Sequence, residues 1–467
     1  MADVTTATRS YGAELAKSVA AIRYDDLPTD VVTIIKLFTL DTLGVIAGAA
    51  KAPGMQELVD SLEAWETGGL STLLLGSNKV NPVSAALANG AAAHALDFDD
   101  QHDPARVHVF CVVLPAVLAA MEAEDRTISG QDIILAVAVG VEVFCRLGLA
   151  CYNSLGKGWH PTTALGTISA AAAVSKIFQL DEAQTLSALG LAFVQLSGTT
   201  QFIADGALAK RVGPGFAARS GVLAAHLARG GITGPHRFLE GQSGLFNLQE
   251  RGEVNPEIVV AEFGTLWQVR DLSMKPYPCC RCNHTVIQLA LELRAKGLKP
   301  VDVKSGLIEL GEVNRKIVGA AFDRSHPTLV VHAQFNAAYA FAAALADGEV
   351  SIRSFTPERI GADDVAYAAT IDTCSTPDYD ETAVAPARVS ITTHDGRVYA
   401  AEKLTMKGAP DEPMTHVEVL AKFASCLEWG FGATGASVEE LQDFVMDLDG
   451  QPDGKQMLKL FMHARGR

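Results

Sequence analysis

Apolar residues recur with the spacing of amphipathic helices over most of the first 265 residues. The stretch 28–50 is an example, because a proline opens it and one face carries Val31, Ile34, Ile35, Phe38 and Val45. One such stretch follows another, so the pattern predicts a large helical domain.

Two windows, 131–152 and 162–178, are apolar on nearly all sides and rich in Ala and Gly, which let helices approach closely. Glu142 and Arg146 interrupt the first window and Lys176 interrupts the second. Neither window therefore offers the roughly 20 uninterrupted apolar residues that a bilayer requires. We predict buried core helices and no membrane partner.

The pattern changes near residue 267. A turn rich in Pro and Cys precedes a helical run at 285–296 and a strand-like pattern at 303–313. Alternating residues at 389–404 flank Asp395–Gly396, a pair suited to the tight turn of a hairpin.

Helical spacing returns from Thr415 onward. We therefore predict a mainly α fold with two domains. The larger domain is all-helical and contains residues 1–266 and 410–467. The smaller one, 267–409, is mixed α/β.

Composition narrows the range of partners and compartments. The formal charge of −16 argues against a nucleic-acid partner, which needs a basic face, and an anionic small molecule would need locally placed cations. The eight cysteines show no paired framework and the first ten residues lack an apolar signal core, so we expect a cytoplasmic protein.

Residues 94–102, HALDFDDQH, gather three acids and two imidazoles after an Ala-rich helical stretch. Asp97, Asp99 and Asp100 cannot all be buried and ionised without partners, because desolvating a carboxylate is costly and like charges raise one another's pKa. The cluster indicates a polar site at a helix end. The alternative is an Asp-rich N-cap in a solvated turn.

Three other segments offer cations and imidazoles to an anionic ligand. They are GWHPTTALGT with His160, AKRVGPGFAARSG with Lys210 and Arg211, and MKPYPCCRCNH with Lys275, Arg281 and His284. Gly and Pro interrupt helix packing there, which can admit a ligand, although a lysine is more often a solvated surface charge.

The cysteine triplet at 279–282 and the acid cluster raise the question of a metal. Cys279 and Cys282 have the two-residue spacer of a zinc knuckle, but no second pair lies at a suitable distance. The acids lack the phosphate-cradling Gly loop that would favour Mg²⁺, and no GxGxxG, Walker or GxSxG motif occurs. We expect no metal and no cofactor.

Taken together, five ordered segments resemble the MmgE/PrpD family, which includes 2-methylcitrate dehydratase, cis-aconitate decarboxylase and iminodisuccinate epimerase. They are HALDFDDQH with His108 and LPAVLAA, GWHPTTALGTISAAAAVSKIFQLD, AKRVGPGFAARSGVLAAHLARGG, KPYPCCRCNH, and AQFNAAYAFAAALADG. The resemblance implies an all-helical domain built from both chain ends, a smaller α/β lid, a homodimer, and a cleft without metal or organic cofactor.

The resemblance also implies the composition of the site. The catalytic residues are expected to be Asp97, His108, His160 and Tyr339, and the substrate-binding residues Gln101, His102, Lys210, Lys275 and Arg281. Asp97 and His108 are the favoured acid/base pair, with Tyr339 or His160 as a second acid. Lys210 and Lys275 suit substrate carboxylates and developing enediolate charge.

The expected activity is that of a lyase that abstracts an α-proton from a small di- or tricarboxylate, most readily a dehydratase like 2-methylcitrate dehydratase. Decarboxylation of the cis-aconitate type and epimerisation of a dicarboxylate such as iminodisuccinate are the alternatives, because one constellation can support all three. A non-catalytic helical binding protein is the alternative from a different class.

Several residues depart from the family pattern. Gln101 replaces a common Thr, Val109–Phe110 a common Pro–Ser, and Asn336 and Ala338 a common Ser and Pro. If Phe110 reaches the pocket, its bulk points away from 2-methylcitrate or towards a substrate with an apolar part.

Overall fold

The computed structural model describes residues 9–66, 68–381 and 383–466. They form two compact units. The helical unit contains the described residues up to Ala95, then Asp99–Leu272, and those from Phe423 onward. The α/β unit contains Leu96–Phe98 and Ser273–Lys422. The prediction of a mainly α fold with a smaller α/β part is confirmed.

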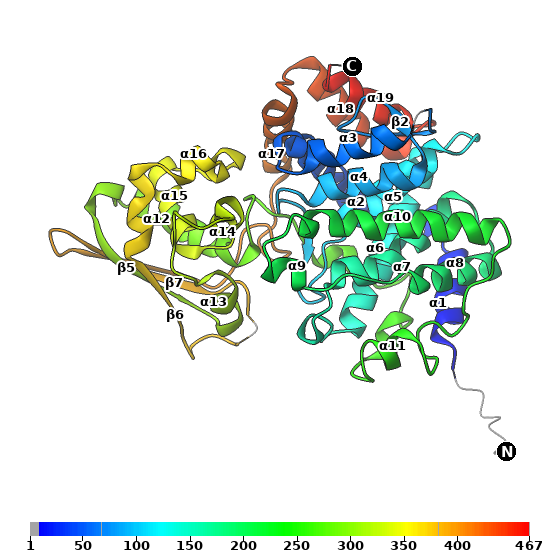
Figure 1. Ribbon diagram of the computed structural model, residues 1–467, viewed down its shortest axis with the longest axis horizontal. Helices are drawn as coiled ribbons and strands as arrows, with labels where there is room; N and C mark the ends of the chain where they lie inside the picture. The colour runs from blue at the N-terminus through cyan, green and yellow to red at the C-terminus, as the bar shows by residue number, and fades with distance from the viewer. Residues whose placement is uncertain (1–8, 67, 382, 467) are drawn as a thin grey trace. The chain divides into compact units, whose positions relative to one another are not determined.

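Helices build nearly all of the helical unit (Figure 1). They are α1 (Tyr11–Ala21), α2 (Thr29–Gly48), α3 (Met55–Trp65), α4 (Pro82–His94), α5 (Phe110–Glu122), α6 (Gly130–Ala150), α7 (Pro161–Ile177), α8 (Glu182–Val194), α9 (Gln201–Ala204), α10 (Ala209–Arg229), α11 (Leu245–Leu248), α18 (Ala436–Met446) and α19 (Gln456–Ala464). Helix α17 (His416–Phe431) begins in the α/β unit and ends in the helical one. Strands β1 (Ser71–Thr72) and β2 (Lys79–Val80) form a short antiparallel pair.

Local sequence signals start several of these helices. The side chain of Asn81 accepts a bond from the Ser84 N–H at the start of α4, where Pro82 takes the first helical position. Ser129 and Asp132 form a capping box that starts α6.

Helix α10 packs between α4 and α7, and glycines allow the close approach (Figure 1). A Cβ atom on Gly215 would lie 2.1 Å from the carbonyl oxygen of Leu87 in α4, and one on Gly221 would lie 2.3 Å from Cβ of Ala170 in α7. Such distances are impossible for real atoms, so only glycine fits.

These contacts also fix the directions of the helices. His94 at the end of α4 contacts Lys210 at the start of α10. Along α10, Gly213 lies against Thr163 of α7 and Gly221 lies against Ala170, so residue numbers rise in the same direction in both helices. Helix α4 is therefore antiparallel to α10, and α7 is parallel to it. The C-terminus of α4 and the N-termini of α7 and α10 lie at one end of the helical unit.

The two apolar windows are core helices, as predicted. They form α6 and α7, whose residues are almost all buried. Residues 29–51 and 130–150 have the length and apolar composition of membrane-crossing helices, but 78% and 89% of their most apolar windows are buried inside the protein.

The charges within α6 have a structural use. Glu142 forms a buried ion pair with Arg146 and accepts a bond from the Gln268 N–H at 2.7 Å. Arg146 donates to the carbonyl groups of four residues of the segment 258–266. The pair fastens this irregular segment to α6 and leaves little polar capacity unsatisfied.

The α/β unit is built around a four-stranded sheet of order β6-β5-β7-β8. Its strands are β5 (Val303–Leu310), β6 (Ile371–Ser375), β7 (Ala387–Thr393) and β8 (Val398–Lys403), and only the β5–β6 pair is parallel. Its helices are α12 (His284–Ala295), α13 (Glu312–Val318), α14 (Leu329–Gln334), α15 (Ala337–Asp347) and α16 (Pro357–Ile360). Helix α12 packs on β7, β8 and α15.

The hairpin predicted at 389–404 is confirmed. Strands β7 and β8 pair in antiparallel register, and Gly396 has a φ of +85° in the turn between them. Alternate residues of β7 are buried, which is the period-2 pattern of a strand with one face on a core.

We expect Gly215→Ala to lower the free energy of unfolding by about 2 to 3 kcal/mol, because the new methyl group would overlap the Leu87 carbonyl group in the packed interior. Chemical denaturation of both proteins measures the difference.

Gly230→Ala is the matched control at the end of the same helix. Its Cβ would meet its nearest neighbour at 3.4 Å, an ordinary contact. This variant should keep the wild-type stability or gain a few tenths of a kcal/mol from a less flexible unfolded chain. Equal losses in both variants would contradict the close helix contact.

Candidate active site

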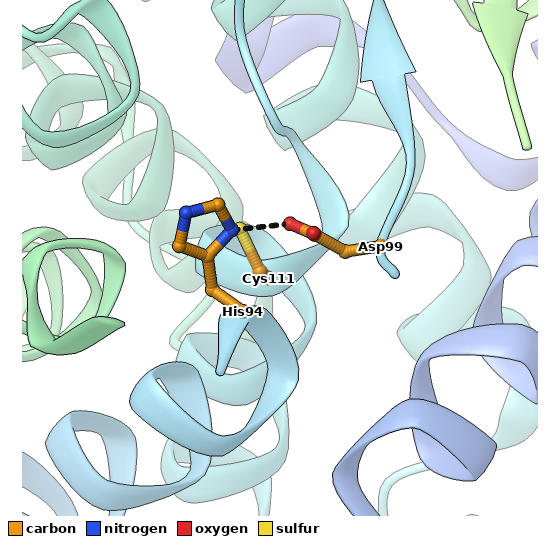
Figure 2. Close-up of side chains that lie close together, drawn as sticks. All are labelled: His94, Asp99 and Cys111. Atoms are coloured by element: carbon orange, nitrogen blue, oxygen red, sulfur yellow. Dashed lines mark hydrogen bonds and ion pairs between the residues drawn. The ribbon is translucent and has the colours of Figure 1, made fainter. Parts of the chain in front are cut away.

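A buried histidine and carboxylate meet a partly buried lysine at the end of the helical unit where α4 stops and α10 starts. His94 is the last residue of α4, and its Nδ1 lies 2.8 Å from Oδ2 of Asp99 (Figure 2). On the other side of the ring, Nε2 lies 3.2 Å from Nζ of Lys210. His94 and Asp99 are almost completely buried.

The chemistry of the two partners assigns the protons of His94. A carboxylate only accepts hydrogen bonds and an ammonium group only donates them, so Nδ1 carries the proton and Nε2 is the acceptor. Burial lowers the pKa of His94 to about 4, and Lys210 adds to this shift while Asp99 opposes it. Burial alone would raise the pKa of Asp99, but the His94 and His108 rings hold it well below its usual range.

His108 precedes α5 and lies beside the same carboxylate. Its Nδ1 lies 2.8 Å from the carbonyl oxygen of Asp100 and 3.4 Å from Oδ2 of Asp99, and its ring centre is 4.8 Å from that of His94. Because a carbonyl oxygen only accepts, Nδ1 of His108 carries a proton. The side chain of His108 is 15% exposed.

Asp100 caps α5. Its two carboxylate oxygens accept bonds from the N–H groups of Val109 and Phe110, each at 2.9 Å. Burial and the neighbouring Asp99 raise the pKa of Asp100 to about 7. The acid cluster is thus both a helix cap and a buried polar site, and the alternative of a solvated turn is wrong because Asp97, Asp99 and Asp100 are all buried.

His160 occupies the N-cap position of α7 in the same unit. Its Nδ1 lies 3.0 Å from Oγ1 of Thr163, and its ring meets the ring of Phe202 edge to face. Gln101 and His102 have local partners, since Gln101 donates to Asp103 and Nδ1 of His102 accepts from the Ala105 N–H. These two side chains shape the turn after the acid cluster.

A second group of predicted residues lies in the α/β unit. Nζ of Lys275 donates to both the carbonyl oxygen and Oδ1 of Asp97, at 3.0 Å each. Asp97 has a φ of +53°, a conformation that a residue other than glycine rarely adopts without support.

Two further side chains of this unit hold the same segment. Gln334 donates to the Leu96 carbonyl oxygen at 2.9 Å, and Lys422 donates to that of Phe98 at 2.9 Å while its Nζ stands 3.9 Å from the centre of the Phe98 ring.

Asp97 and His108 belong to different units, so their pairing as acid and base stays a prediction. Within the helical unit, the carboxylate beside His108 is that of Asp99.

Tyr339 and Arg281 have structural positions in the α/β unit. The Tyr339 hydroxyl donates to the Ser354 carbonyl oxygen, its ring packs in the core, and burial raises its pKa. Arg281 is buried and donates to Oγ of Ser273 at 2.8 Å. The acid role of Tyr339 and the substrate contact of Arg281 stay predictions.

Two departures from the family pattern have structural explanations. The side chain of Asn336 caps α15 by accepting a bond from the Tyr339 N–H at 2.8 Å. The Phe110 ring is completely buried and stacks on Phe38 of α2 at 5.2 Å. Its packing in this core removes the reason to read Phe110 as a limit on substrate size.

His94, Asp99 and Cys111 also offer a nitrogen, an oxygen and a sulfur within 4.8 Å of one another, a geometry that can hold a metal ion (Figure 2). These donors are already engaged, however. Asp99 accepts from His94, Cys111 donates to the His108 carbonyl oxygen, and burial raises the pKa of the Cys111 thiol. With the Lys210 ammonium group also against the ring, the cluster fits a hydrogen-bond network better than a cation.

The catalytic and substrate-binding residues expected from the resemblance do not include His94 or Asp99. The signal was present, because both lie in the motif HALDFDDQH, five residues apart around the end of a helix. Nothing in that motif ranked one aspartate above the others.

Comparison with known proteins agrees along nearly the whole chain. The MmgE/PrpD N-terminal domain matches residues 13–256 and the MmgE/PrpD C-terminal domain matches residues 277–448. A cis-aconitate decarboxylase of Aspergillus terreus is 29% identical, covering 96% of this chain and 95% of that protein. The cis-aconitate decarboxylase-like protein oryM of Aspergillus oryzae is 27% identical, covering 96% of each chain. The cis-aconitate decarboxylase of Homo sapiens is 27% identical, covering 95% of this chain and 93% of that protein. The chain therefore belongs to the MmgE/PrpD family and is an enzyme of the lyase class.

Proposed function

We propose that the enzyme is a carboxy-lyase that removes CO₂ from a small unsaturated tricarboxylate, with cis-aconitate as the first candidate. The sequence alone ranked dehydration first. The names of the relatives, which match over nearly their full lengths, move decarboxylation ahead of it. The structural observation that carries the proposal is the placement of Lys210 and His108 around the buried Asp99–His94 pair.

The surroundings of this cluster suit an anion. Helices α7 and α10 begin at this end of the unit, and α5 begins there as well, since Gly90 of α4 lies against the carbonyl group of Cys111. Helix N-termini carry partial positive charge, which adds to that of Lys210. Because the whole protein has a formal charge of −16, these local charges must attract the substrate.

The proposed reaction needs a cation and a proton donor. As the carbon–carbon bond to one carboxylate breaks, its electron pair spreads over the adjacent double bond and a remaining carboxylate, and CO₂ leaves. Lys210 stabilises this developing negative charge. The imidazolium of His108 then gives its Nε2 proton to carbon, and solvent restores that proton. The balance is one proton consumed and one CO₂ released.

The remaining residues have supporting roles in this proposal. His160, at the start of α7, is a candidate second donor to a substrate carboxylate. Lys275 neutralises Asp97 and is the predicted carboxylate-binding residue of the α/β unit. The homodimer and the cytoplasmic location stay predictions, and sedimentation and cell fractionation test them.

The first test is to incubate the enzyme in D₂O with cis-aconitate, 2-methylcitrate, citrate, tartrate and iminodisuccinate, following proton NMR and CO₂ release. We expect CO₂ only from cis-aconitate, with one deuteron on carbon in the product. Loss of water from a hydroxy acid would establish a dehydratase instead. Exchange at carbon without loss of water or CO₂ would establish an epimerase.

We expect Lys210→Met to raise KM by about tenfold or more and to lower kcat, because a charge-assisted bond to a substrate carboxylate is lost. Steady-state kinetics of CO₂ release measure both.

Lys176→Met is the matched control. Lys176, like Lys210, is partly buried, and it donates to three backbone carbonyl groups, among them that of Ile22 at 2.8 Å. This variant should lose thermal stability and keep the wild-type KM. Equal increases in KM in both variants would show that loss of any partly buried lysine raises KM, and would contradict a specific role for Lys210.

We expect His108→Asn to lower kcat by about a hundredfold or more, with little change in KM. The Asn amide can still donate to the Asp100 carbonyl oxygen, but it cannot deliver the proton that Nε2 carries. Single-turnover kinetics measure the chemical step. The exposed His236→Asn is the control, and a variant at position 108 that keeps more than a tenth of the wild-type kcat would exclude His108 as the proton donor.

A further inference from the structure

We propose that His94 is a positioning residue that holds Lys210 for substrate binding. Asp99 orients its ring, and the ring in turn offers Nε2 as the acceptor for the lysine ammonium group. The inference rests on the proposed function, because it assigns Lys210 to a substrate carboxylate. It adds a residue that the expected catalytic and binding sets do not contain.

The first argument is geometric. Asp99 is completely buried and His94 is 1% exposed, so water cannot replace either partner. Asp99 Oδ2, the His94 ring and Lys210 Nζ form a continuous chain with contacts of 2.8 and 3.2 Å. The Asp99 carboxylate only accepts hydrogen bonds and the Lys210 ammonium group only donates them. A single tautomer of the His94 ring, protonated on Nδ1, therefore satisfies both partners.

The second argument concerns charge. Among the described residues of the helical unit, Asp99, Lys210, the ring of His108 and the thiol of Cys111 face His94. A protonated ring would have no lone pair for Lys210 and would repel it. Burial keeps the pKa of His94 at about 4, so the ring stays a neutral acceptor from about pH 5 upward.

The third argument concerns freedom of movement. A lysine side chain has four rotatable bonds, and fixing it on binding costs conformational entropy. A buried acceptor that already holds Nζ removes part of that cost before the substrate arrives. The ammonium group has three N–H donors, so the bond to His94 leaves capacity for a carboxylate.

The competing view is that His94 only satisfies the buried Asp99, with Lys210 nearby by coincidence. Two variants separate these views. Gln at position 94 keeps an acceptor near the place of Nε2, whereas Asn keeps a donor near the place of Nδ1.

We expect His94→Gln to bind within about threefold of wild type and His94→Asn to bind about tenfold more weakly or worse, the size of a lost hydrogen bond to a charged group. The probe is tricarballylate, a saturated tricarboxylate, and calorimetry measures its Kd. The opposite order, equal losses or no loss in either variant would overturn the inference. Melting temperatures show whether each variant is folded.

A double-mutant cycle tests the route through Lys210. In a Lys210→Met background, His94→Asn should cause no further loss of tricarballylate affinity, because the group that His94 positions is gone. A full tenfold loss in that background would mean that His94 acts on the ligand by another route, and the inference would fail.

A ligand-free measurement makes failure of the inference distinguishable from failure of the proposed function. Nitrogen-15 NMR of histidine-labelled enzyme, assigned by comparison with His94→Gln, should show a neutral ring protonated on Nδ1 from about pH 5 to about pH 8. The Nε2 resonance should shift in Lys210→Met. Protonation on Nε2, or titration of the ring within this range, would overturn the inference even if cis-aconitate is decarboxylated. The expected NMR and binding results without any CO₂ release would leave the inference standing and remove only the proposed reaction.

Discussion

The buried carboxylate of Asp99 is the constraint on which the arrangement of the helical unit's polar cluster depends. An ionised carboxylate without water is stable only with donors or positive charge close to it. Here Nδ1 of His94 donates to Oδ2 of Asp99 at 2.8 Å, and Nδ1 of His108 lies 3.4 Å from the same oxygen. Meeting this requirement sets the tautomer of His94, which in turn sets the partner of Lys210. The buried Asp99 carboxylate thus determines the arrangement of the His94 and His108 rings and, through His94, that of Lys210.

Helix packing brings these groups to one place. The glycines of α10 allow α4 and α7 to pack closely against it, and this packing brings the helix ends to one end of the unit. Most residues of α6 and α7 are buried, which explains why their sequence windows are apolar on nearly all sides. The polar groups are concentrated where helices end, since backbone N–H groups there still need partners.

The connection from α4 to α5 belongs to both units. Leu96–Phe98 is part of the α/β unit, whereas the residues on either side of it are part of the helical unit. Lys275, Gln334 and Lys422 hold this short segment, and they stabilise the unusual backbone conformation of Asp97. The stretch that carries the acidic motif is therefore also a covalent link between the units.

Local patterns determined much of this protein without reference to its tertiary structure. The two windows that are apolar on nearly all sides identified the core helices α6 and α7, the Asp395–Gly396 pair identified the hairpin, and the ordered motifs identified the family. Short-range rules suffice there, because helix caps, turns and alternating faces depend on neighbouring residues. Strand β6 was missed because five residues without strong alternation carry little signal, and it exists through its pairing with β5.

Only the tertiary structure decided what each polar residue does. Asp97, Asp99 and Asp100 have the same chemistry and lie within four positions, yet they pair with Lys275, pair with His94 and cap α5, respectively. The direction of each side chain follows from the path of the backbone, including the left-handed conformation at Asp97, and no local rule predicts that path. Tyr339 fits a catalytic motif by type, but the surrounding core commits its hydroxyl to a carbonyl group. Residue types are properties of the sequence, whereas partners, burial and protonation depend on segments that meet only in the folded chain.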